Sequence, residues 1–245
     1  MKILVTNDDG IHCEGLTILA EELSKEHEVW IFAPDGDRSG TSHSMTLRSP
    51  SKVRRLEERV FTCSGVPADC VMMVRMGAIP FRPDIVVSGI NRGPNLGTDL
   101  LYSGTAAAAR QAVLYDTPGI AVSLATYNPP FDFKPSARFV REHLGDLLNL
   151  WDDTVFININ VPPALNLESL EAVHARPGRR RYTDSLHAFE APDGYSYCFV
   201  TGGKIENEED PYSDIEVVNS GRVAISRVLV HPQVSAGFPV GKIFP

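Results

Sequence analysis

The chain has 245 residues, of which 43% are hydrophobic and 22% are charged, a composition typical of a globular protein with one large domain or two small ones. A chain of this length buries enough surface to fold without disulfide bonds. The 23 Lys and Arg residues and 31 Asp and Glu residues give a net charge of −8, which disfavours duplex nucleic acid as a partner because binding to a phosphate backbone depends on cationic side chains.

The first two thirds of the chain alternate between predicted strands and helices. Short apolar runs without polar alternation predict strands that are buried on both faces of a parallel sheet, at residues 3–6, 28–33, 85–88, 120–124 and 155–160. Helical spacing of apolar residues, or alanine behind capping residues, predicts helices at residues 14–26, 103–114 and 136–150. This alternation predicts a doubly wound α/β fold with a mostly parallel sheet.

The C-terminal third of the chain has a different character. Helical periodicity fades, and strand-like pieces at residues 195–200 and 223–229 predict a β-hairpin region. We expect the parallel sheet to be complete by residue 160. The predicted organisation is therefore a Rossmann-like core over residues 1–163 and a C-terminal extension with a hairpin arm over residues 164–245, both within one domain.

Nothing in the sequence predicts secretion or a membrane segment. The apolar run at the N-terminus ends at Asp8 and Asp9, too early for the apolar region of a signal peptide, and no window approaches 18 apolar residues. The four cysteines form no Cys-x-x-Cys pair, which excludes a zinc knuckle or a thioredoxin motif. We therefore expect a cytoplasmic protein with reduced thiols and no membrane partner.

Three loops follow predicted strands, at the edge of the sheet where ligands bind in open α/β folds. The first carries the adjacent carboxylates Asp8 and Asp9, which repel each other unless a cation lies between them. Mg²⁺ or Mn²⁺ suits such a pair, because these hard ions prefer oxygen ligands. An Asx turn with Asp9 and Gly10 is the structural alternative, but the position at the end of the first buried strand favours a metal site.

The second loop, residues 34–44, is rich in hydroxyl groups and glycine and contains His43. A solvated loop would have a similar composition. His43 is a candidate for protonating a leaving group or binding phosphate, and a packing role is its alternative. None of the seven histidines has the spacing of a metal-binding pair, so the candidate metal ligands are oxygen atoms.

The third loop, residues 88–105, is long and contains four glycines before a predicted helix. Residues 103–105 begin that helix, where free backbone N–H groups and the helix dipole favour an anion such as phosphate. A simple N-cap at Ser103 is compatible with this interpretation. Asn91 and Asn95 offer neutral oxygen atoms that can complete a metal shell without adding charge.

Four motifs, in one order along the chain, carry a family resemblance. They lie at residues 3–11 (ILVTNDDGI), 33–44 (Ala-Pro, Arg-Ser-Gly and His-Ser), 65–70 (GVPADC) and 88–105 (SGINRGPNLG and YSGT). Together they resemble the SurE family of stationary-phase survival proteins, which are metal-dependent 5'/3'-nucleotidases. The resemblance covers residues 1–125 strongly, and residues 158–162 and 179–182 extend it more weakly.

The resemblance implies a Rossmann-like fold and one divalent ion, Mg²⁺ or Mn²⁺. The implied metal ligands are Asp8, Asp9, Ser39 and Asn95. The implied phosphate and substrate site is lined by Asn91, Gly93, Ser103, Gly104 and Thr105. Residues 210–214 depart from the pattern that is common in the family, which leaves the course of the C-terminal arm open.

A homodimer or homotetramer is expected on two grounds. The resemblance implies oligomers with extended C-terminal arms. Independently, a two-stranded hairpin is marginal alone, and its exchange between identical subunits is a low-cost route to a dimer. The basic residues 176–181 and the acidic residues 206–210 are candidates to meet across that interface. For the basic run, a solvated face or contact with an acidic substrate are the alternatives.

The expected activity is hydrolysis of phosphomonoesters, with nucleoside monophosphates as substrates. The sequence leaves open whether inorganic polyphosphate is a further substrate. Asp8 and Asp9 are the candidate catalytic residues, and either can take the proton of an attacking water. An aspartyl-phosphate phosphatase is the enzymatic alternative, but Gly10 occupies the position of its usual second Asp. A nucleotide-binding regulatory protein on the same fold is the non-enzymatic alternative.

Overall fold

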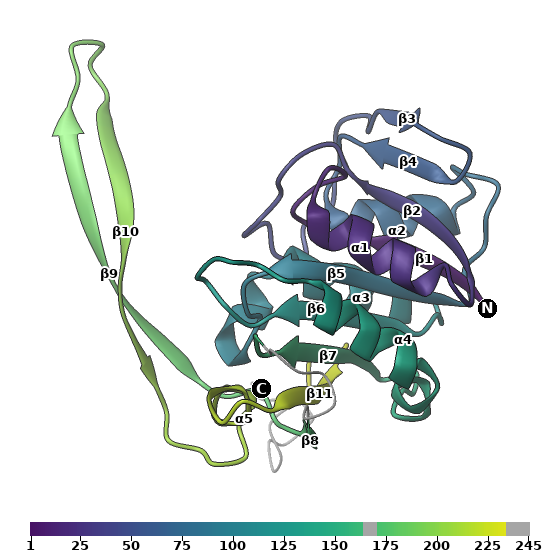
Figure 1. The fold of residues 1–245 in the computed structure, drawn as a ribbon. Helices are drawn as coiled ribbons and strands as arrows, with labels where there is room; N and C mark the ends of the chain where they lie inside the picture. The colour runs from purple at the N-terminus through teal and green to yellow at the C-terminus, as the bar shows by residue number, and fades with distance from the viewer. Residues whose placement is uncertain (164–170, 234–245) are drawn as a thin grey trace, which may run out of the picture.

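The computed structural model describes residues 1–163 and 171–233, so residues 164–170 and 234–245 of the predicted C-terminal extension lie outside the described residues. Its centre is a nine-stranded sheet in the order β3-β4-β2-β1-β5-β6-β7-β11-β8 (Figure 1). The strands are β1 (Lys2–Thr6), β2 (Glu28–Pro34), β3 (Val53–Arg55), β4 (Val60–Cys63), β5 (Ile85–Arg92), β6 (Gly119–Leu124), β7 (Val155–Val161), β8 (Ala172–His174) and β11 (Val223–Leu229). The helices are α1 (Glu14–Leu23), α2 (Pro67–Arg75), the 3-10 helix η1 (Gly97–Leu101), α3 (Gly104–Val113), α4 (Lys134–Asn149) and α5 (Asp214–Asn219).

Helices cover both faces of the sheet, and successive residues of β1 show how the core is divided. Ile3 and Val5 pack in the cluster that contains the apolar faces of α1 and α4. Leu4, between them, packs in the cluster that contains residues of α2 and α3. Because both faces of the strand are buried, its sequence is a continuous apolar run rather than an alternating one.

The predicted doubly wound α/β fold is confirmed. β2, β1, β5, β6 and β7 are neighbours and pair in parallel, and each contains a strand that the sequence predicted. The sequence analysis did not predict β3, β4 or α2. β3 is only three residues long and exposed, and β4 has four residues. α2 begins at Pro67, and the Asp69 carboxylate accepts the backbone N–H of Val66 at 3.0 Å, which is a helix-start signal within the GVPADC motif.

The far edge of the sheet differs from the prediction. β11 pairs antiparallel with β7 and parallel with β8, so the sheet is not complete at residue 160 and residues 223–229 do not belong to a hairpin. The prediction is wrong because β7 would otherwise leave its backbone N–H and C=O groups unpaired along an edge. Val223 and Ile225 are buried in the main core cluster, which accounts for the apolar character of β11.

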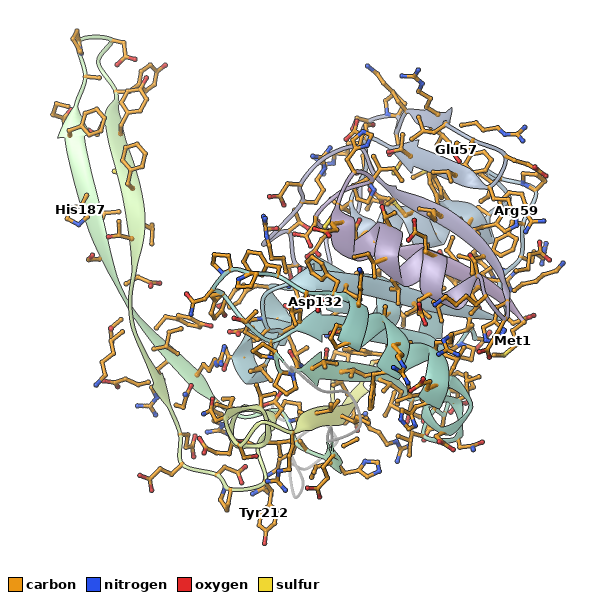
Figure 2. The ribbon with its side chains drawn as sticks, in the orientation of Figure 1. Met1, Glu57, Arg59, Asp132, His187 and Tyr212 are labelled. Atoms are coloured by element: carbon orange, nitrogen blue, oxygen red, sulfur yellow. The ribbon has the colours of Figure 1, made fainter. Side chains whose placement is uncertain are left out.

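The predicted hairpin arm is confirmed in the remaining C-terminal strands. β9 (Arg180–Glu190) and β10 (Ser196–Asn207) form a separate antiparallel pair that extends away from the core (Figure 1). Nearly all of its residues are exposed, and Figure 2 shows His187 well along the arm with the side chains around it spread into open space. The predicted strand at residues 195–200 lies within β10, apart from its first residue.

The basic and acidic runs meet at the base of this hairpin, within one chain. Arg176 Nε lies 2.5 Å from Asp210 Oδ2, and Arg179 Nη1 lies 3.8 Å from Glu208 Oε2. The idea that the two runs pair across an interface is therefore wrong for these residues. The reason is geometric: the segments that flank an antiparallel hairpin are brought side by side by its strands.

Asp214, at the start of α5, ties this base to the core. Its side chain is fully buried, and its two carboxylate oxygens accept the backbone N–H groups of Gly97 at 2.8 Å and Gly178 at 2.9 Å. Burial raises the pKa of Asp214.

No helix within the described residues is long and apolar enough to cross a membrane.

Replacing Asp214 tests this connection. Asp214→Ala leaves two buried backbone N–H groups without their acceptor, and we expect a loss of about 2 kcal/mol in the free energy of unfolding. Chemical denaturation followed by circular dichroism measures it. Asp146→Ala, at a carboxylate whose side chain is 84% exposed, is the control and should leave the midpoint in place. An unchanged midpoint in Asp214→Ala would show that the connection adds no stability.

Candidate active site

A cavity of about 290 Å³ opens where the loops that follow β1, β2 and β5 meet the start of α3. It contains six of the residues that the sequence singled out, namely Asp8, Ser39, Asn91, Gly93, Asn95 and Ser103. We call it the Asp8 cavity. The loops converge because β2, β1 and β5 are adjacent parallel strands whose carboxyl ends lie at one edge of the sheet.

Asp8 is the most deeply buried carboxylate of this cavity. Its residue is 3% exposed, and its Oδ1 accepts the hydroxyl of Thr105 at 2.5 Å. Burial, with a further contribution from the charge of Asp9, raises the pKa of Asp8 to about 6. A cation in the cavity would favour the ionised form, so the environment of Asp8 suits a positively charged ligand.

The first turn of α3 lies directly against Asp8. A Cβ atom on Gly104 would lie 2.8 Å from the Asp8 Cβ and 2.9 Å from its Oδ2, so only glycine allows this approach. Ser103 caps the helix, because its Oγ accepts the backbone N–H of Ala106 at 3.0 Å. The N-cap interpretation of Ser103 is therefore confirmed, and its side chain also lines the cavity.

Asn95 is held from several sides. Its backbone oxygen accepts the side-chain amides of Asn158 and Asn160, each at 3.0 Å, and its own Nδ2 donates to Ser123 Oγ at 2.9 Å. Among the described residues no hydrogen bond ends on its Oδ1, so this oxygen remains for a ligand. Asn158 and Asn160 come from the buried strand β7, where two polar residues in an apolar run were the available signal of a supporting role.

Asp9 and Ser39 lie at the outer side of the site. Asp9 Oδ2 accepts the backbone N–H of Arg92 at 3.2 Å, and burial raises its pKa. Asp9 does not line the Asp8 cavity but a second one of about 430 Å³, which shares Arg92 with the first and which we call the Phe131 cavity. Ser39 lines the Asp8 cavity and donates its hydroxyl to Asp37 at 2.6 Å.

His43 and Thr105 lie apart from the cavity wall. His43 Nε2 is 2.8 Å from Gln111 Oε1, further along α3 than the helix start, and burial lowers the pKa of His43. Thr105 is fully buried, and its hydroxyl donates to Asp8. His43 is therefore not among the residues that line the Asp8 cavity.

Two residues that the sequence analysis did not single out also line the Asp8 cavity. Tyr127 follows β6, and Asp99 lies in η1, within the predicted loop at residues 88–105. Tyr182, from the base of the hairpin, lines the cavity as well, and its hydroxyl donates to Asp99. The weak family match at residues 179–182 was a signal for Tyr182, whereas nothing in the sequence pointed to Tyr127.

The oxygen atoms around Asp8 fit a hard divalent cation. Asp8, Ser39 and Asn95 contribute a carboxylate, a hydroxyl and an amide oxygen, and the charge of Asp9 acts on Asp8 although Asp9 lines the neighbouring Phe131 cavity. In the described parts of the chain no three His, Cys, Asp or Glu side chains gather into a metal-binding group. A set with only two charged ligands is appropriate for Mg²⁺ or Mn²⁺, which keep several water ligands.

Comparison with known proteins identifies the family of the chain. A family model described as "Survival protein SurE" matches residues 3–184. A 5'-nucleotidase SurE of Synechococcus sp. (strain JA-3-3Ab) is 40% identical over 235 residues, which cover 92% of this chain and 90% of that protein. The corresponding protein of Geotalea uraniireducens is 40% identical, with 92% of each chain covered. The crystal structure of the SurE protein from Aquifex aeolicus superposes with a TM-score of 0.81 at 30% identity over 95% of each chain. The chain belongs to the SurE family.

Proposed function

We propose that this protein is a divalent-metal-dependent phosphomonoesterase that hydrolyses nucleoside monophosphates. The observation that carries the proposal is the pairing of a buried carboxylate, Asp8, with the first turn of α3 at one cavity. A metal ligand and an anion-binding helix start in direct contact suit a phosphate ester held on a cation. The similar proteins named 5'-nucleotidase support the choice of substrate.

One ion, Mg²⁺ or Mn²⁺, is proposed to lie between Asp8, Asp9, Ser39 and Asn95. When bound, such an ion polarises the phosphoryl group and lowers the pKa of a water that can attack it. Thr105 holds Asp8 Oδ1, and the other carboxylate oxygen, Oδ2, lies against Gly104 at the start of α3. The Arg92 backbone N–H orients Asp9, which is the candidate to accept the proton of the attacking water.

The phosphate is proposed to bind at Asn91, Gly93 and the start of α3. Asn91 Nδ2 donates to Gly93 O at 2.9 Å, which shapes the loop that lines the cavity. Ser103 and the backbone N–H groups of the first turn offer donors to the charge that develops on the phosphoryl oxygens. Protonation of the leaving group by His43 stays a prediction, and its contact with Gln111 does not favour it.

The test is release of inorganic phosphate from adenosine 5'-monophosphate, adenosine 3'-monophosphate and polyphosphate by the purified chain with Mn²⁺ present. We expect release from the 5'-monophosphate at a rate that is linear in enzyme concentration. Comparison of the three substrates defines the preferred class. Tight binding of the nucleotide without phosphate release would overturn the proposal and favour a nucleotide-binding regulatory protein.

The arm is proposed to join copies of this chain into a homodimer or homotetramer, while residues 1–163 with β8 and β11 form the catalytic unit. On the hairpin, the exposed rings of Phe189 and Tyr197 stack at 5.6 Å, and Phe189 and Phe199 at 5.8 Å. Such an apolar face on a two-stranded ribbon needs a covering surface. A second copy of the chain is the proposed cover.

Shortening the arm tests this assembly. Ser185 and Thr201 are paired across the hairpin, so an Asn-Gly turn can replace residues 186–200 without touching β11. We expect light scattering at micromolar concentration to give an oligomer for the full chain and a smaller species for the shortened one. A monomeric full chain would refute the assembly, and an unchanged oligomer after shortening would place the interface elsewhere.

A further inference from the structure

Three tyrosines from three separate segments line the Asp8 cavity. Tyr102 follows η1, Tyr127 follows β6, and Tyr182 lies in β9. Although they line a cavity, Tyr102, Tyr127 and Tyr182 remain 57%, 62% and 40% exposed. Aromatic rings that are exposed yet gathered at one cavity offer flat apolar surface to a ligand. We call these three residues the tyrosine rim.

Contacts with neighbouring residues position two of the three rings. The Tyr182 hydroxyl donates to Asp99, which also accepts from the guanidinium of Arg180, and the Arg180 side chain is only 8% exposed. Tyr127 lies against Gly93, since a Cβ on this glycine would be 3.3 Å from the Tyr127 ring. Tyr102 immediately precedes the N-cap Ser103, which places its backbone beside the start of α3. The rim therefore lies beside the proposed phosphate site.

We propose that the tyrosine rim binds the base of the nucleoside monophosphate by stacking, and that it does so without selecting among bases. This inference rests on the proposed function. Asp99 accepts from both Arg180 and Tyr182, and the guanidinium of Arg92, which also lines the cavity, lies over the ring of Phe131. These charged groups are therefore engaged by protein partners rather than by the edge of a base. Stacking on an aromatic ring accepts every base, since each has a π-face.

The Phe131 cavity is the competing place for the base, and its chemistry is less suitable. The Arg92 guanidinium already covers the ring of Phe131 at 5.6 Å, and Phe133 is 3% exposed within the main core cluster. Four acidic residues also line this cavity: Asp9, Glu14, Asp35 and Asp37. Its aromatic faces are thus occupied, whereas those of the rim are exposed.

The experiment compares a substrate that has a base with one that lacks it. For each variant, kcat/KM is measured for adenosine 5'-monophosphate and for ribose 5-phosphate, and the ratio of the two values is taken. Tyr127→Ala should lower this ratio about tenfold, while Tyr127→Phe keeps it. Tyr182→Ala should lower it as well. The monophosphates of adenosine, guanosine, cytidine and uridine should differ only a few-fold with the unaltered chain.

Phe131→Ala is the matched control for loss of an aromatic ring. A ratio that is unchanged in both tyrosine variants, or that falls in Phe131→Ala instead, would overturn the inference. Calorimetric affinities for adenosine 5'-monophosphate and for inorganic phosphate give a second readout that needs no turnover. If the unaltered chain releases no phosphate, the proposed function fails, but the binding experiment still tests the tyrosine rim. Weaker nucleotide binding by Tyr127→Ala would support the rim, and unchanged binding would reject it.

Discussion

Excess EDTA should abolish phosphate release from nucleoside monophosphates, and Mg²⁺ or Mn²⁺ added beyond the chelator should restore it. The reason is the donor set of the Asp8 cavity, where carboxylate, hydroxyl and amide oxygens lie beside the helix start that is proposed to hold the phosphate. Without a cation, the carboxylates of Asp8 and Asp9 would repel the anionic substrate. The readout is the initial rate measured colorimetrically.

EDTA that has been saturated with Mg²⁺ before addition is the control for effects of the chelator itself, and it should leave the rate unchanged. Ribose 5-phosphate should respond in the same way as a nucleotide, because the metal acts on the phosphate. A full rate in excess free EDTA would contradict metal dependence.

Asp8→Asn should lower kcat by about 100-fold or more, the effect expected when one strong electrostatic contact to the transition state is removed. The substitution is isosteric, and the Thr105 hydroxyl can still donate to the amide oxygen that replaces Oδ1. The fold should therefore persist. Asp146→Asn, at an exposed carboxylate, is the matched control and should retain the rate.

Asp8→Asn should also raise the stability of the metal-free fold, although it lowers the activity. The pKa of Asp8 is raised to about 6 in the folded chain, so at higher pH its ionised form destabilises the metal-free fold relative to the unfolded chain. Metal-free Asp8→Asn should accordingly melt at a higher temperature than the unaltered protein at pH 8, and the difference should shrink as the pH falls below 6.

For the activity prediction, a metal-saturated Asp8→Asn enzyme with an unaltered rate would remove Asp8 from the mechanism.

The sequence predicted the parallel half of the sheet because its strands are buried on both faces. Residues such as Ile3, Leu4 and Val5 leave no polar alternation, and that pattern is specific enough to place β1. The same reasoning failed for β11, because an apolar strand does not show whether it returns along the sheet or pairs in a hairpin. Only the open edge of β7 decides between the two.

The candidate site was predictable to the extent that it is built from strand ends. Asp8, Asn95 and Ser103 meet because β1, β5 and α3 are neighbours, and the order of the loops predicts this. Tyr182 was out of reach of such reasoning, since about 80 residues separate it from Asp99 and the hairpin had to be placed first. His43 was proposed from its loop alone, and the fold turns it toward Gln111.

The C-terminal departure from the family pattern has a clear structural outcome. Residues 210–214 left the course of the arm open at the level of sequence. In the structure Asp210 pairs with Arg176, and Asp214 accepts two backbone N–H groups from Gly97 and Gly178. The altered segment therefore still anchors the base of the arm beside the site, which the composition of the segment alone did not reveal.

The most direct test of a metal-dependent site at Asp8 is a titration of the metal-free chain with Mn²⁺, in which bound ion is counted by electron paramagnetic resonance while phosphate release from adenosine 5'-monophosphate is followed in the same samples. We predict that one Mn²⁺ binds per chain, that the rate rises in proportion to occupancy, and that Asp8→Asn weakens the binding. Phosphate release at zero occupancy, or a fully occupied site that leaves the rate at its starting value, would contradict the account.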